Sequence, residues 1–186
     1  MVGAMLCGDE PLHGPVFTWL RRFGGNLFTQ LPIMVSARSC LRRHTTFAAR
    51  FTKMRGVVRR VREALAALGD RAGGSDILFE PAEPQACLVH TYFGAATMDT
   101  VMDAIEEVQR DTGVRVVSRV RQSRFAPEGV VAMAADGDCP PAGVLQPFTY
   151  TEWNMGVCNM EIDDDTFVQG WTALAKALAA RRQPQA

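Results

Sequence analysis

A long amphipathic helix, predicted over Phe47–Leu68, constrains the fold of this chain more than any other feature. Apolar residues recur there every three or four positions, which places them on one stripe of a helix about 33 Å long at about 1.5 Å per residue. The stripe consists of Phe47, Phe51, Met54, Val58, Val61, Leu65 and Leu68. Arginines occupy much of the remaining surface. We therefore expect this helix to be buried along one side by other elements of the fold.

The chain after this helix alternates between strand-like and helical patterns. A turn with Gly73 and Gly74 separates the two regions. Strands are predicted over Ile77–Phe79, Ala86–Phe93, Val114–Val120, Val130–Met133 and Tyr150–Ile162, the last bent at Gly156, and helices over Thr97–Thr112 and Thr166–Arg181. Two amphipathic helices on one face of a small sheet predict an α+β domain with mostly antiparallel strands.

The residues before the long helix have a different pattern. Met1–Cys7 is continuously apolar, which is typical of a strand covered on both faces in an α/β sheet. Gly14 and Pro15 are expected to break the chain, and helices are predicted after them, over Val16–Phe23 and over Pro32–Arg43. The fold class expected for the whole chain is therefore α/β passing into α+β.

A loop between these two helices is a candidate binding element. Arg21 and Arg22 are followed by Gly24, Gly25 and Asn26. Paired glycines permit positive φ angles and close backbone approach to a ligand. A helix end capped by glycine, followed by a plain connector, explains the same pattern without any ligand.

The order of these segments resembles the C-terminal half of the L-threonine aldolase and aromatic amino acid β-eliminating lyase family, which uses pyridoxal phosphate (PLP). The residues that carry the resemblance are MVGAMLCGD at 1–9, TWLRRFGGNLFTQLPI at 18–33 and the arginine-rich helix. It covers most of 1–180 and is sharpest over 1–68. The family has the aspartate aminotransferase fold. It implies that 1–46 is the end of the large cofactor domain, 47–74 a connecting helix and turn, and 75–182 a small C-terminal α+β domain.

The resemblance also implies roles for particular residues. Arg21 matches a basic residue that helps to hold the cofactor phosphate, and Gly24, Gly25 and Asn26 lie in the cofactor loop. The second basic residue of the family falls at Phe28, and Thr151–Ile162 contains no arginine to pair with a substrate carboxylate. The lysine that binds PLP covalently precedes the region that matches this chain. No catalytic residue and no metal ligand is therefore assigned.

Other kinds of site find little support in the sequence. His13, His44 and His90 lie far apart without metal-ligand spacing. His90, on a strand, is better explained as a partly buried, hydrogen-bonded histidine. The run Asp163–Asp165 is better explained as a helix cap than as a metal cluster. The arginines of 47–68 lack interleaved exposed aromatics, so a solvated or acidic-partner surface is favoured over nucleic acid.

Composition bounds the cellular setting. The formal net charge is zero, and no apolar run reaches the roughly 20 residues of a membrane span. The five cysteines have no CxxC spacing. Reduced thiols and a cytoplasmic location are therefore expected.

Two functions follow from these patterns. The chain is expected to be part of a PLP-dependent lyase or aldolase for a β-hydroxy or β-substituted amino acid, a homo-oligomer that is inactive as this chain alone. The alternative is a non-catalytic interaction module whose surface is the exposed face of 1–30. Lys53 and Lys176, the only lysines, lie in predicted helices and not in positions suited to a cofactor.

Overall fold

The computed structural model describes residues 10–22, 34–36, 38–39, 42, 44–94, 96–123 and 148–182. The chain divides into two compact units, 1–47 and 48–186. In the first unit, helix α1 spans Glu10–Arg22, and 34–36 and 38–39 are helical. The expected break at Gly14 and Pro15 is wrong, because Pro15 lies inside α1. The predicted strand Met1–Cys7 lies outside the described residues.

The second unit is a mixed α+β fold, as the sequence predicts. Helix α3 (His44–Leu68) is followed by the short 3-10 turn η1 (Asp70–Ala72), strands β1 (Leu78–Glu80) and β2 (Leu88–Tyr92), and helix α4 (Met98–Thr112). Strands β3 (Arg121–Ser123) and β4 (Phe148–Asn154), the 3-10 turn η2 (Val157–Met160) and helix α6 (Asp164–Ala180) complete the described part of the chain.

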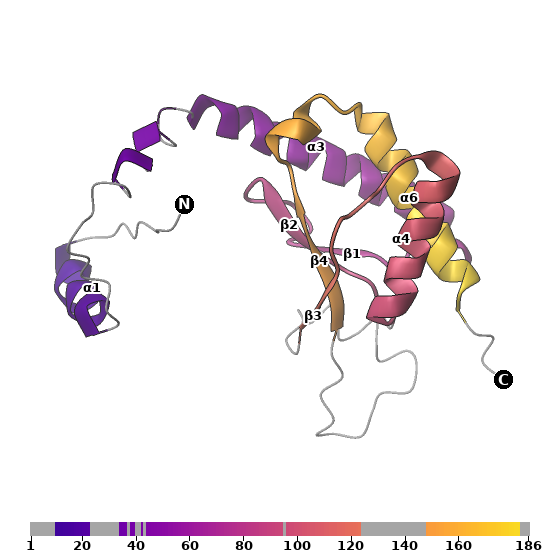
Figure 1. Ribbon diagram of the computed structural model, residues 1–186, viewed down its shortest axis with the longest axis horizontal. Coiled ribbons are helices and arrows are strands. Elements are labelled where there is room, and N and C mark those ends of the chain that lie inside the picture. Colours follow the sequence, from indigo (N-terminus) through magenta and orange to yellow (C-terminus); the bar gives the residue numbers. More distant parts are fainter. Residues whose placement is uncertain are drawn as a thin grey trace, which may run out of the picture. The chain divides into compact units, whose positions relative to one another are not determined.

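The four strands form one antiparallel sheet in the order β1-β2-β4-β3. In Figure 1, α4 and α6 lie side by side and pack against each other. Helix α3 directs five buried side chains into the same core: Met54, Val57, Val58, Val61 and Leu65. The predicted stripe is therefore confirmed in its centre, whereas Phe47 at its start is exposed.

Alternation along the strands gives the sheet two different faces. Phe79, Val89 and Trp153 point into the core with the helices, and so do the buried threonines opposite one another at Thr91 and Thr151. The outer face carries Glu80, His90, Tyr92, Tyr150 and Glu152, which lie at alternate positions. An antiparallel sheet with one covered face and one polar face produces this period of two.

Two predicted strands differ from the structure. Residues 114–120 form no strand, and β3 begins only at Arg121. The chain there turns away from the sheet because Val114 and Val116 pack against Gly170 of α6, where a methyl group would crowd both side chains. The last predicted strand ends at Asn154 rather than Ile162, since the chain then turns into η2. Val130–Met133 lies outside the described residues.

Among the described residues, no helix is long and apolar enough to cross a membrane.

Candidate functional site

The residues assigned to the cofactor loop are only partly described. Arg21 lies in the last turn of α1, and nothing is described of its side chain. Gly24, Gly25 and Asn26 lie outside the described residues. Their proposed contact with the cofactor phosphate therefore stays a prediction.

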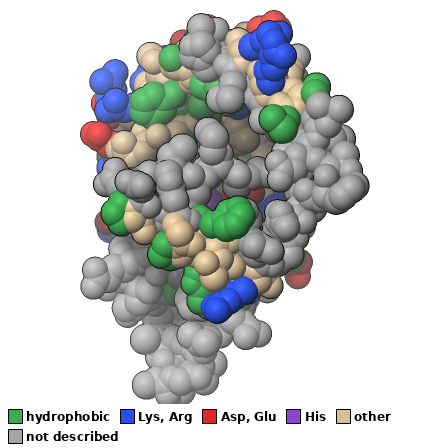
Figure 2. All heavy atoms as spheres, turned by 90° about the vertical axis from the view of Figure 1, so that its left-hand side faces the viewer, with side chains coloured by type: hydrophobic (Ala, Val, Ile, Leu, Met, Phe, Trp, Pro, Cys, Tyr) green, Lys and Arg blue, Asp and Glu red, His purple; other side chains and the backbone are tan. Residues whose placement is uncertain are grey.

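Helix α1 presents two large apolar side chains at its surface. Phe17 is 57% exposed and Trp19 is 53% exposed, and the guanidinium of Arg22 lies 5.0 Å from the centre of the Trp19 ring. Hydrophobic side chains also reach the surface in several places on the side of the molecule that Figure 2 shows. An interaction surface is built from side chains of this kind.

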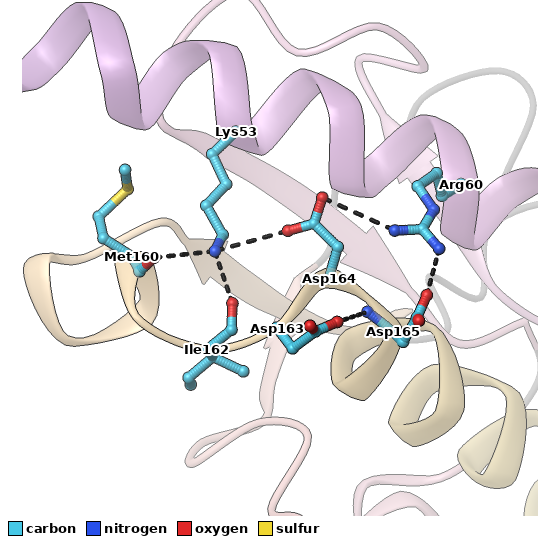
Figure 3. A network of polar contacts seen from close by, with 7 residues as sticks. All are labelled: Lys53, Arg60, Met160, Ile162, Asp163, Asp164 and Asp165. Atoms are coloured by element: carbon cyan, nitrogen blue, oxygen red, sulfur yellow. Dashed lines mark hydrogen bonds and ion pairs between the residues drawn. The ribbon is translucent and has the colours of Figure 1, made fainter.

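A polar network joins α3 to the start of α6 (Figure 3). Lys53 Nζ donates to the carbonyl oxygens of Met160, at 2.9 Å, and Ile162, at 2.5 Å, and lies 3.5 Å from Asp164 Oδ1. The lysine side chain is only 15% exposed. Arg60, two turns further along α3, pairs with Asp164 and Asp165.

The aspartate run caps α6, as the sequence predicts. Asp163 is the N-cap, and its Oδ1 accepts a hydrogen bond of 2.7 Å from the backbone N–H of Asp165. No group of side chains suited to a metal ion occurs in the described parts of the chain. The hydrogen bond from Arg60 to Asp165 raises the pKa of the arginine above its ordinary value. These carboxylates therefore serve the helix N-terminus and its attachment to α3.

The two lysines do not fit covalent attachment of PLP. Lys53 is held by two carbonyls and a carboxylate, so its amine is engaged within the fold. Lys176 is exposed on α6. Neither lysine lines one of the pockets described for this chain, and the absence of covalently bound PLP stays a prediction.

The outer face of the sheet groups three aromatic rings. Tyr92 and Tyr150 lie on neighbouring strands with their ring centres 5.7 Å apart in a stacked arrangement. His90 meets the same Tyr150 edge-on at 5.6 Å. His90 is half-buried, as predicted, but no hydrogen bond of its ring to the described residues is seen, and that half of the prediction is not confirmed. Burial raises the pKa of Tyr92, and the nearby Tyr150 and Glu80 raise it further.

A pocket of about 400 Å³ lies beside β4, between the segment 114–121 and the start of α6. Aromatic rings form part of its wall. The Trp153 and Trp171 ring centres are 4.9 Å apart, and Phe167 lies 5.9 Å from Trp153. Within the described residues, the buried indole N–H of Trp171 has no hydrogen-bond partner.

Three arginines line the same pocket together with one carboxylate. Arg121 Nη1 lies 3.2 Å from Glu152 Oε1, so these two charges offset each other. Arg115 donates to the neutral Gln109 side chain at 2.7 Å. The side chain of Arg119 is exposed and has no hydrogen bond or ion pair within the described residues. The lining therefore carries an excess of positive charge.

This pocket was not predicted from the sequence. Its three arginines lie at odd-numbered positions of 115–121, but Val117 and Ser118 interrupt the alternation expected of a half-exposed extended segment. That pattern was the signal available in the sequence. The three-dimensional fold is what places these arginines in one pocket with Trp153 and Trp171.

A scan of the sequence against protein-family models found no match, and comparisons with curated proteins and with solved structures found none either.

Proposed function

We propose that this chain is the C-terminal part of a PLP-dependent lyase or aldolase that acts on a β-hydroxy or β-substituted amino acid. It is inactive alone. In the complete enzyme it forms one side of the cofactor cleft and takes part in a homo-oligomer. PLP, when bound, supplies an electron sink for the bond cleavage. Arg21, Gly24, Gly25 and Asn26 contact its phosphate, and the attaching lysine comes from outside this chain.

One observation carries the proposal. The segments that resemble the family, over 1–68, are followed by an α+β layer of the kind expected for its small domain. Helices α3, α4 and α6 pack into a core on one face of an antiparallel sheet.

A specific observation favours a second function. Phe17 and Trp19 of α1 are more than half exposed. A non-catalytic interaction module that uses the face of 1–30 would need such side chains.

Two experiments test these proposals, and the first decides between them. The genomic sequence upstream of the Met1 codon is translated in frame, and a continuous reading frame with a lysine-containing cofactor segment is expected. The extended chain should then bind PLP and cleave a β-hydroxy amino acid. An in-frame stop codon preceded by a ribosome-binding site would contradict the enzyme and support the interaction module.

The second experiment uses the chain alone. It is incubated with PLP and reduced with borohydride, and its peptides are mapped. We expect no stoichiometric modification of Lys53 or Lys176 at low PLP concentration. Selective modification of one of them would overturn the statement that this chain cannot hold the cofactor covalently.

A further inference from the structure

We propose that the pocket beside β4 binds a small organic carboxylate with an apolar body, and that Arg119 holds the carboxylate. This inference does not rest on the proposed lyase function, because it concerns only the segment 114–121, β4 and α6, and its test uses the chain alone.

The pocket lies beside the part of β4 that is no longer paired with β3. Strand β3 pairs with β4 only from Phe148 to Tyr150, whereas β2 pairs with β4 as far as Asn154. Thr149 accepts from Phe93 N–H on the β2 side, and Met155 donates to Cys87 O on the same side. Antiparallel strands alternate the side to which each residue directs its backbone groups. The backbone N–H and C=O of Glu152 therefore point to the side of β4 on which β3 lies, but β3 does not extend far enough to pair with them.

The segment 114–120 leaves the position beside Glu152 open because it packs on α6 and does not pair with β4. Val114 and Val116 pack on Gly170, so the chain diverges from β4 before reaching Asn154. Unpaired backbone groups of β4, as well as side chains, therefore line the pocket. Backbone N–H and C=O groups that have no ladder partner are suitable hydrogen-bonding groups for a ligand.

The charges of the pocket select an anion. Arg121 is neutralised by Glu152, at 3.2 Å. Arg115 and Arg119 have no carboxylate partner among the described residues. The nearby carboxylates of Asp164 and Asp165 pair with Lys53 and Arg60 of α3 and do not line this pocket. A guanidinium is the natural partner of a carboxylate.

The apolar wall selects the rest of the ligand. Among the aromatic residues of the lining, Phe167 is half-buried, whereas Trp153 and Trp171 are 4% and 0% exposed. The Trp153 ring centre lies 4.9 Å from that of Trp171 and 5.9 Å from that of Phe167. At about 400 Å³ the pocket falls in the range of roughly 300–1,000 Å³ that small-molecule sites occupy. An aromatic or branched aliphatic group matches this wall better than a phosphate or a bare inorganic anion. The ligand class is therefore a monocarboxylate with one apolar group.

Binding can be followed with the protein's own tryptophans. The chain has three, of which Trp153 and Trp171 line the pocket and Trp19 lies in α1. Phenylacetate is titrated into the ¹⁵N-labelled chain, and the three indole N–H signals are recorded after assignment with Trp19→Phe. We expect the signals of Trp153 and Trp171 to shift with saturation, while that of Trp19 stays in place.

Charge dependence is tested in two ways. Phenylacetamide, the neutral isostere, should bind at least about tenfold more weakly than phenylacetate to the unchanged protein, because it loses the charged partner. Arg119→Gln should weaken phenylacetate binding about three- to tenfold, since an exposed charge contributes less than a buried one. Arg110→Gln, an exposed arginine of α4 that does not line the pocket, is the matched control and should leave binding unchanged.

Several results would overturn the proposal. These are the absence of any saturable shift of Trp153 and Trp171, equal binding of acid and amide, and wild-type affinity in Arg119→Gln. A shift of Trp19 equal to that of the other two would indicate binding elsewhere. Since Arg119 is exposed, its variant is expected to fold, and the comparison of acid with amide needs no variant at all.

Discussion

Lys53 connects α3 to the loop before α6 through three oxygen atoms. Its Nζ reaches Met160 O, Ile162 O and Asp164 Oδ1 (Figure 3). We expect Lys53→Met to lower the free energy of unfolding by about 1.5–3 kcal/mol, because it retains the apolar stem but leaves the oxygens without their cation. Urea unfolding measures this loss as a lower midpoint with an unchanged slope.

The only other lysine is a matched control for this prediction. Lys176 is exposed on α6, so Lys176→Met should change stability by no more than about 0.5 kcal/mol. Equal effects of the two substitutions would show that the α3–α6 network contributes no stability of its own.

Tyr92 should make stability depend on pH in the alkaline range. Its pKa is raised above 10.0, chiefly by burial, so the folded protein retains the phenol proton longer than the unfolded chain does. The contribution of Tyr92 is fully present below pH 10 and is lost as pH rises through the folded pKa. Tyr92→Phe should therefore show a smaller loss of stability above pH 10 than the wild type, in denaturant titrations at several pH values. A parallel decline in both proteins would contradict this.

Residue types with a local role could be predicted from the sequence. The role of Asp163 as a helix cap follows from its neighbouring residues and is confirmed. The partners of Lys53 lie more than 100 positions away, so no local pattern identifies them. The same holds for the pocket arginines, whose meaning depends on the tryptophans opposite them.

At the scale of elements, the turn η1 fixes the end of α3 against α6. Gly73 has φ 84°, and a methyl group there would collide with the carbonyl oxygen and carbon of Ala175 in α6. Gly113, which ends α4, has the same left-handed backbone, with φ 74° and ψ −2°, but a methyl group there would meet open space. The two glycines share the backbone requirement and differ in packing.

This difference gives a paired prediction. Gly113→Ala should cost about 1–2 kcal/mol, which is the strain of an L-residue in the left-handed region. Gly73→Ala should cost at least about 2 kcal/mol more, because the turn or α6 must move. Thermal unfolding of both variants measures the difference. Equal costs would mean that η1 does not pack on α6 as closely as described.

Element predictions held where one periodicity governed a segment and failed where tertiary contacts competed. Helices α4 and α6 agree with the sequence to within two residues at each end. Val114–Val120 is predicted as a strand, yet packing against Gly170 draws its first half out of the sheet. Pro15 indicated a helix boundary, yet α1 continues through it.

At the scale of the whole molecule, α3 belongs to the folding core. The change of pattern near Gly69–Gly74 predicts an independent unit over 75–182, but five side chains of α3 are buried in the same cluster as Trp153 and Trp171. Each contributes about 1.5–3 kcal/mol, and their sum is comparable with the whole stability of a domain. Fragment 44–182 should therefore unfold cooperatively, and fragment 75–182 should not. Cooperative melting of fragment 75–182 would restore the boundary at 69–74.

The last prediction concerns association of the whole chain. Met34 and Val35 are exposed together with Phe17 and Trp19, all in the first unit. Their combined apolar surface favours association with a second copy or a partner, whether the chain is part of an enzyme or an interaction module. We expect the full chain to self-associate in sedimentation velocity, and a variant without residues 1–30 to sediment more slowly and to stay in solution at higher concentration. Phe17→Ser with Trp19→Ser should reproduce part of this effect without truncation. A monomeric full chain, with no gain from the deletion, would mean that 1–30 covers its own apolar side chains, and the interaction module would lose its principal physical support.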